Sequence, residues 1–181
     1  MRMQFEPAPP AGKLTREQTK AAFERYHLLA KGNHAGGDWD RMGEMYAENA
    51  SYYDAFYGWL HGREAITRWL RESMKGLEGW EYPVQWVAID EGRVVVHWLN
   101  RLPGARPDGS RYEFPGLSAI TYNDDGKVIR QLDLYDGIDT LETVFEAKLG
   151  PVGRALRQAT RVVGPALRES TRAFYRLFEK S

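Results

Sequence analysis

The fold is decided by residues 45–54, MYAENASYYD, and by the segment GREAI at residues 62–66. Residues 50–56 are rich in aromatic side chains, a composition that favours a short β-strand. Gly62 then precedes a run of apolar side chains at helical spacing, which Gly76 ends. The apolar residues of this run are Ile66, Trp69, Leu70 and Met74. We therefore predict a strand followed by an amphipathic helix.

Two more helices are predicted before this strand. Thr15 and Gln18 have the spacing of a capping box, which begins a helix. Its apolar positions are Ala22, Phe23, Tyr26, Leu29 and Ala30. We expect the helix to end at Gly32 and residues 36–37. A second, short helix is predicted from residue 38 to about residue 47.

From residue 80 onward the apolar residues alternate, which is typical of β-strands. The predicted strands are 80–88, 93–101, 111–123 and 127–136, separated by turns rich in Gly, Pro, Asn and Asp. Helices followed by an antiparallel meander indicate an α+β fold, with the helices on one face of a curved sheet.

The two ends of the chain differ from this central part. Residues 1–13, with three prolines, are predicted to be a flexible leader, and residues 14–140 the folded domain. Residues 141–181 are predicted to be a basic, amphipathic helical tail, and residues 147–181 hold eight basic and two acidic side chains. We interpret the tail as an extension that packs on its own domain or on a second copy. The alternative is an element that binds an anionic membrane surface.

Composition excludes several classes of function. The 25 basic and 25 acidic residues balance, which argues against nucleic acid as the main partner. The chain has no cysteine, and its four histidines lack the spacing of a metal site, so no metal and no cofactor are expected. No apolar run approaches the roughly 20 residues of a membrane span, and no secretory signal is recognisable. These features fit a cytoplasmic protein.

Candidate catalytic residues lie on the first predicted strand. Tyr52, Asp54 and Phe56 share one face by the two-residue period of a strand. Burial between two aromatic rings raises the pKa of a carboxyl group, which makes the carboxylate a stronger base. The alternative for Asp54 is an aspartate in water at the strand end.

Further candidates lie on other elements. Asp133 and Tyr135 share one face of the last strand, unless Asp133 is a surface carboxylate. Trp98 and Asn100 share a face of the strand before the long turn, and Asn100 could hydrogen-bond a substrate or only hold the turn. Tyr26 could donate to a developing oxyanion or could be an ordinary core tyrosine.

The segments at 45–54 and 62–66, together with GKVI at 126–129 and DLYD at 133–136, resemble the nuclear transport factor 2-like superfamily. The resemblance covers about residues 14–140. It implies a cone-shaped, curved antiparallel sheet wrapped on N-terminal helices, with the C-terminal helical extension outside it. It also implies a homodimer formed through the outer face of the sheet, where Trp86 and His97 are expected.

Three enzyme families share this fold. By resemblance to ketosteroid isomerase, the general base falls on Asp54, the oxyanion tyrosine on Tyr26, and a second donor near Ser118. By resemblance to limonene epoxide hydrolase, Tyr52 and Asp54 fall on the residues that hold substrate and water. The Asp-Arg-Asp centre of that family falls on Asn100, Trp98 and Asp133, so two of its three residues are altered. The SnoaL-type polyketide cyclases place an acid–base aspartate in the same cavity.

We therefore expect a cofactor-independent acid–base enzyme, an isomerase or lyase of SnoaL-like type, that takes a small, apolar, ring-bearing substrate. The expected catalytic residues are Asp54, Tyr26 and Asp133. The expected substrate-binding residues are Tyr52, Phe56, Trp98, Asn100, Ser118 and Tyr135. The alternatives are a non-catalytic ligand-binding or dimeric interaction module, a protein that docks through its basic tail, and an epoxide hydrolase with an altered centre.

Overall fold

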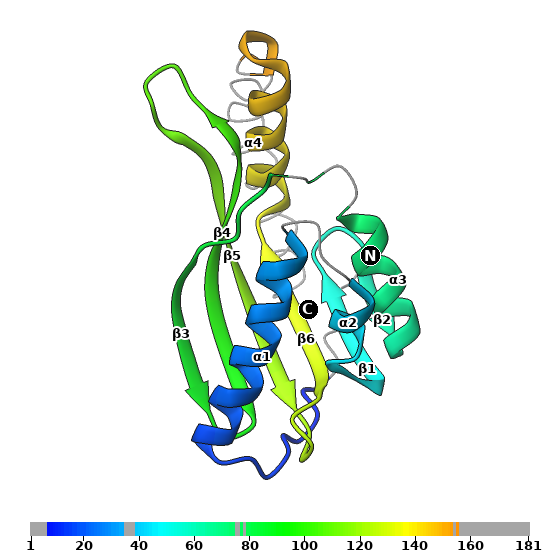
Figure 1. Cartoon of the computed structure of the whole chain (residues 1–181). Coiled ribbons are helices and arrows are strands. Elements are labelled where there is room, and N and C mark those ends of the chain that lie inside the picture. The colour runs from blue at the N-terminus through cyan, green and yellow to red at the C-terminus, as the bar shows by residue number, and fades with distance from the viewer. Residues whose placement is uncertain (1–6, 35–38, 75–76, 78, 154, 156–181) are drawn as a thin grey trace, which may run out of the picture. The chain divides into compact units, whose positions relative to one another are not determined.

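The computed structural model describes residues 7–34, 39–74, 77, 79–153 and 155. Its elements follow in the order α1 (Arg16–His34), α2 (Trp39–Gly43), β1 (Tyr46–Asp54), β2 (Gly58–His61), α3 (Arg63–Ser73), β3 (Val84–Asp90), β4 (Arg93–Ala105), β5 (Arg111–Tyr122), β6 (Val128–Tyr135) and α4 (Gly137–Leu149) (Figure 1). The chain divides into two compact units. The first comprises residues 1–103 and 113–137, and the second residues 104–112 and 138–181.

The first unit is built on a curved six-stranded sheet with the strand order β2-β1-β6-β5-β4-β3 (Figure 1). The predicted α+β fold is confirmed, but the prediction of a purely antiparallel sheet is wrong at one pair. Strand β1 pairs with β6 in parallel, whereas β1–β2, β3–β4 and β5–β6 are antiparallel. The chain leaves β1 through β2 and α3 and makes the meander β3–β6 before it returns beside β1. This return brings residues from the two ends of the domain together.

The helices of the first unit cover one face of the sheet, and α1 lies across it (Figure 1). The capping box is present, since Thr15 N donates to Gln18 Oε1 at 2.8 Å and Gln18 N donates to Thr15 Oγ1 at 3.2 Å. The helix continues past Gly32 to His34, because one glycine weakens a helix without having to end it. The core between helices and sheet includes Phe23, Ile66, Leu70, Val94, Val96 and Ile120.

Strand β1 begins earlier than predicted and α2 ends earlier. Residues 46 and 47, expected in the short helix, belong to β1. The cause is pairing with β6, because Tyr46 lies opposite Val128 and Val128 N donates to Met45 O at 2.8 Å. The ladder to the neighbouring strand thus overrides the local preference for a helix.

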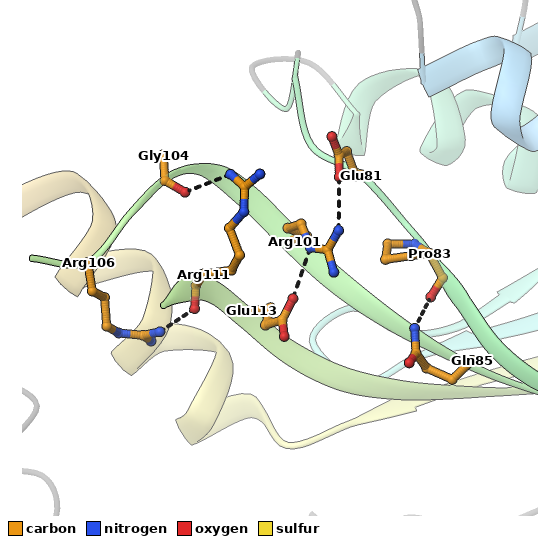
Figure 2. A network of polar contacts seen from close by, with 8 residues as sticks. All are labelled: Glu81, Pro83, Gln85, Arg101, Gly104, Arg106, Arg111 and Glu113. Atoms are coloured by element: carbon orange, nitrogen blue, oxygen red, sulfur yellow. Dashed lines mark hydrogen bonds and ion pairs between the residues drawn. The ribbon is translucent and has the colours of Figure 1, made fainter. Parts of the chain in front are cut away.

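The meander strands are also shifted from their predicted limits. Strand β3 begins at Val84, and residue 81 only forms an isolated bridge to Arg101. The Arg101 side chain donates to Glu113 at 2.9 Å and to Glu81 at 3.3 Å, which links three segments of the first unit (Figure 2). Strand β4 continues to Ala105, so the predicted long turn is shorter than expected.

The described part of the second unit is the tip of the β4–β5 hairpin and helix α4. Arg106 donates to Glu146 at 3.1 Å and lies 4.8 Å from the ring centre of Tyr112. At the hairpin tip, Arg106 also donates to Arg111 O, and Arg111 donates to Gly104 O at 3.3 Å (Figure 2). The predicted tail overlaps α4, and its predictions for residues 154 and 156–181 lie outside the described residues.

Residues 7–13 of the expected leader are hydrogen-bonded to the first unit. Arg130 on β6 donates to Pro7 O at 2.6 Å. Gly12 N donates to Tyr122 O at 2.8 Å, and Lys13 N donates to the Asp124 carboxylate at 2.5 Å. These hydrogen bonds hold residues 7–13 against β5 and β6, whereas the three prolines had led us to predict a flexible leader.

Candidate active site

The candidate site lies on the face of the sheet that carries the core, where β1, β6 and β5 run side by side. Asp133 on β6 is opposite Asp54 on β1 and opposite Ser118 on β5. The side chains of Asp133 and Tyr135 point to this face, as the two-residue period predicted. Two carboxyl groups therefore occupy neighbouring positions on adjacent strands.

Asp133 accepts hydrogen bonds at both carboxyl oxygens. Ser118 Oγ donates to Oδ1 at 2.6 Å, and Gln131 Nε2 donates to Oδ1 at 3.0 Å. The Tyr52 hydroxyl donates to Oδ2. Among the described residues, none of those that hydrogen-bond to Asp133 carries a positive charge.

The pKa of Asp133 is raised from its ordinary value of 3.8. Burial of the carboxyl group is the largest cause, and the nearby charge of Asp54 raises the pKa further. The hydrogen bonds from Ser118, Tyr52 and Gln131 act in the opposite direction without cancelling the effect of burial. Asp133 therefore holds its proton to higher pH than an aspartate in water.

Trp98 extends the network from β4 to β5. Its indole Nε1 donates to Ser118 Oγ at 2.8 Å, and Ser118 Oγ in turn donates a hydrogen bond to Asp133 Oδ1. The indole lies over Gly116, where an added Cβ would be 2.2 to 2.5 Å from three ring carbons. Glycine at 116 is therefore required for Trp98 to reach Ser118.

Two members of this network, Gln131 and Tyr46, were not predicted from the sequence. Gln131 Oε1 accepts hydrogen bonds from Tyr26 at 3.0 Å and from Tyr46 at 2.8 Å. The signal for Gln131 was available, because it lies two residues before Asp133 and so shares its face. Tyr46 was assigned to a helix instead. The hydroxyl of Tyr26, one candidate donor to an oxyanion, points to Gln131 in this structure.

Asp54 has a different set of partners. Its Oδ1 accepts hydrogen bonds from Phe56 N at 2.8 Å and from Tyr57 N at 3.0 Å, and its Oδ2 accepts one from Tyr135 at 2.7 Å. The two backbone bonds turn the chain at the end of β1. The prediction that Phe56 continues the strand is therefore wrong, because an aspartate side chain that binds backbone N–H groups competes with the strand ladder.

Aromatic rings surround the two carboxyl groups. The ring of Tyr135 lies 5.6 Å from Phe56, 6.4 Å from Trp98 and 6.3 Å from Phe114, measured between ring centres. Burial raises the pKa of Tyr135 well above its ordinary range, so its hydroxyl stays protonated. The surroundings of the carboxyl pair are apolar rings with a few fixed hydroxyl groups.

Asn100 is buried on the same face of β4 as Trp98. In the part of the chain that the structure describes, its side-chain amide makes no hydrogen bond. Five of the residues predicted for the site belong to the Asp133 network, directly or through Gln131: Tyr26, Tyr52, Trp98, Ser118 and Asp133. Asp54 and Tyr135 form a separate hydrogen-bonded pair. Phe56 packs on Tyr135, and Asn100 lies on the shared face without joining the network.

Within the described ranges, no group of three or more His, Cys, Asp or Glu side chains is arranged to hold a metal ion. Likewise, no described helix is both long enough and apolar enough to cross a membrane.

The sequence model of the SnoaL-like domain matches residues 22–131, which is more than half of the chain. This chain belongs to the SnoaL-like domain family. The suspected superfamily is thereby confirmed. The matched range holds the elements from α1 to the middle of β6 and most of the network, whereas Asp133 and Tyr135 follow directly after it.

Solved structures agree with the family assignment. A protein from Shewanella putrefaciens described as a SnoaL-like polyketide cyclase has a TM-score of 0.58 and 12% identity, covering 70% of this chain and 85% of its own. An LEH-like epoxide hydrolase of M. tuberculosis has a TM-score of 0.56 and 18% identity, covering 76% and 94%. The epoxide hydrolase/cyclase-like enzyme SalBIII has a TM-score of 0.53 and 19% identity, and the match covers 68% of this chain and 94% of SalBIII. Because these identities are low, the comparison shows that the SnoaL-like chain has the same fold as these three proteins. No curated protein sequence matches it.

Proposed function

We propose that this SnoaL-like protein is a cofactor-independent acid–base enzyme, an isomerase or lyase, that acts on a small, apolar, ring-bearing molecule. The observation that carries the proposal is the carboxyl group of Asp133. It has a raised pKa, three uncharged hydrogen-bond donors and a second carboxyl group on the adjacent strand.

Asp133 suits proton transfer because its pKa is moved from the ordinary acidic range toward the pH at which an enzyme works. A group of this kind can take a proton in one step and return it in the next. Positioned acid–base groups contribute typically about 10²–10⁴-fold to a rate.

Asp54 is assigned a supporting role. Its carboxylate is occupied by two backbone N–H groups and by the hydroxyl of Tyr135. In this arrangement Asp54 holds the turn after β1 and orients Tyr135. We therefore assign proton transfer to Asp133, and we assign the binding of a polar substituent to Asn100, whose amide is buried beside Trp98.

The substrate class is inferred from the rings around the carboxyl pair. Phe56, Trp98, Phe114 and Tyr135 offer flat apolar contacts, which favour an aromatic or polycyclic molecule. Isomerase or lyase chemistry is favoured over epoxide hydrolysis because Trp98, instead of a cation, occupies the position of the arginine in the epoxide hydrolase centre.

The test is to incubate a set of aromatic and polycyclic compounds with wild type and with Asp133→Asn, followed by chromatography coupled to mass spectrometry, which separates isomers of equal mass. Asp90→Asn is the matched control, because Asp90 is exposed at the end of β3. We expect a product from wild type and the control but not from Asp133→Asn. A compound bound by all three proteins and converted by none would instead identify a ligand-binding module.

A further inference from the structure

Gln131 connects two tyrosine hydroxyls to the carboxyl group of Asp133. Its side chain is only 2% exposed. Its Oε1 accepts from Tyr26 at 3.0 Å and from Tyr46 at 2.8 Å, and its Nε2 donates to Asp133 Oδ1 at 3.0 Å. The oxygen and the nitrogen of the Gln131 amide are therefore both hydrogen-bonded to other side chains.

The ionised form of Asp133 favours the amide orientation seen in the structure, with Nε2 of Gln131 toward Oδ1. Exchanging Oε1 and Nε2 would place a carbonyl oxygen against Asp133 Oδ1, so two acceptors would face each other. Burial raises the pKa of Tyr26 and Tyr46 above their ordinary range, so both hydroxyls keep a hydrogen to donate to Oε1. The Nε2 of Gln131 therefore faces Asp133.

The two oxygens of Asp133 are consequently not equivalent. Among the described residues, Oδ1 accepts from two donors, Gln131 Nε2 and Ser118 Oγ, whereas Oδ2 accepts only from the hydroxyl of Tyr52. A hydroxyl can accept a hydrogen bond as well as donate one, but the amide N–H can only donate. A proton on Oδ2 can thus be shared with Tyr52, while a proton on Oδ1 would meet the N–H of Gln131.

We propose that Gln131 is a positioning residue, which together with Ser118 reserves Oδ1 of Asp133 as an acceptor and so confines the exchangeable proton to Oδ2. This inference rests on the proposed function, in which Asp133 moves a proton. It goes beyond that function by naming the oxygen that carries the proton and the residue that selects it.

Gln131 is uncharged, so its replacement by an apolar residue changes no charge near Asp133. The titratable groups that face Asp133 are Tyr26 on α1, Tyr46, Tyr52 and Asp54 on β1, and Tyr135 on β6. All of these remain in a Gln131→Met variant. A change in the titration of Asp133 would therefore report the lost hydrogen bond.

The experiment is a titration of the Asp133 carboxyl carbon by ¹³C NMR in the full chain, for wild type and Gln131→Met. We expect the pKa of Asp133 to rise by about one unit in the variant, because its ionised form loses a donor. Tyr46→Phe is the second variant, which removes a donor from Oε1 of Gln131 and leaves all three donors to Asp133. It should give a smaller rise in the same direction.

A folded Gln131→Met variant with an unchanged Asp133 pKa would overturn the inference. If Gln131→Met does not fold, an unchanged pKa in Tyr46→Phe overturns it, and a rise supports it. The titration needs no substrate, so its result is independent of the search for a reaction. A shifted pKa without turnover of any compound would leave the positioning of the proton standing and would contradict only the enzymatic role.

Discussion

Asp54 and Asp133 lie opposite each other on the parallel strands β1 and β6, yet within the described residues their carboxyl groups have no hydrogen-bond partner in common. Asp54 accepts two bonds from the backbone and one from Tyr135. The hydrogen bonds that Asp133 accepts from described residues come from the side chains of Ser118, Gln131 and Tyr52. This difference supports a structural role for the first carboxyl group and a chemical role for the second.

The raised pKa of Asp133 predicts how stability depends on pH. The folded state binds this proton more tightly than the unfolded state. The resulting stabilisation is fully present below the ordinary pKa of 3.8 and is lost as the pH rises through the raised value. The free energy of unfolding of wild type relative to Asp133→Asn should therefore fall over that interval. Urea denaturation of both proteins from about pH 3.5 to 7 measures it, and a difference that stays constant would contradict the raised pKa.

The turn role of Asp54 predicts different effects for two substitutions. Asp54→Asn retains an oxygen that can accept from Phe56 N and Tyr57 N, whereas Asp54→Ala leaves both without this partner. We expect Asp54→Ala to lower the free energy of unfolding by about 1–3 kcal/mol and Asp54→Asn to lower it by clearly less. Denaturation of the two variants side by side provides the measurement. Equal losses would mean that the bonds from the backbone do not hold the turn.

The close approach of the Trp98 indole to Gly116 can be tested by substituting the glycine. The Cβ in Gly116→Ala would lie 2.2 to 2.5 Å from indole carbons, so Trp98 has to move away from Ser118. We expect a loss of about 1–3 kcal/mol in unfolding free energy, together with a change in tryptophan fluorescence. Combining Gly116→Ala with Trp98→Leu is the control, because the smaller side chain frees the space. The two changes together should cost less than the sum of the single changes, and strict additivity would argue against the contact.

The outer face of the sheet predicts a homodimer. Exposed apolar side chains gather on β3 to β6, opposite the face of Asp133: Trp86, Val95, Leu117 and Leu134. Trp86 is 50% exposed, and a contiguous apolar surface of this kind favours association. We expect sedimentation to give a dimer for wild type and a monomer for Trp86→Glu. Leu28→Glu on α1, at a leucine that is 68% exposed, should remain a dimer. A monomeric wild type would refute this expectation.

The fold could be predicted because its signals are local. A capping box began α1, and alternation marked the strands of the meander. The parallel pairing of β1 with β6 could not be read from local pattern, since it depends on where the chain returns after the meander. The start of β1 at Tyr46 was missed for the same reason, because its partner Val128 is distant in sequence.

Most residues of the candidate site could be predicted from the sequence, but the hydrogen bonds between them could not. The two-residue period placed Asp133 and Tyr135 on one face, and it could also have included Gln131. Which hydroxyl donates to which oxygen depends on side-chain geometry that no spacing rule specifies. The requirement for glycine at position 116 could not be predicted from the sequence. It arises only because the indole of Trp98 occupies the space that a Cβ at residue 116 would fill.

The most direct test of the central claim is conversion in D₂O of whichever ring-bearing compound wild type turns over. Delivery of a solvent-exchanged proton from Asp133 to a substrate carbon predicts deuterium at that carbon of the wild-type product, detected by mass spectrometry and located by NMR. Asp133→Asn should lose both the product and the label, while Asp90→Asn retains both. Turnover by Asp133→Asn at the wild-type rate, with the same label, would contradict the assignment of proton transfer to Asp133.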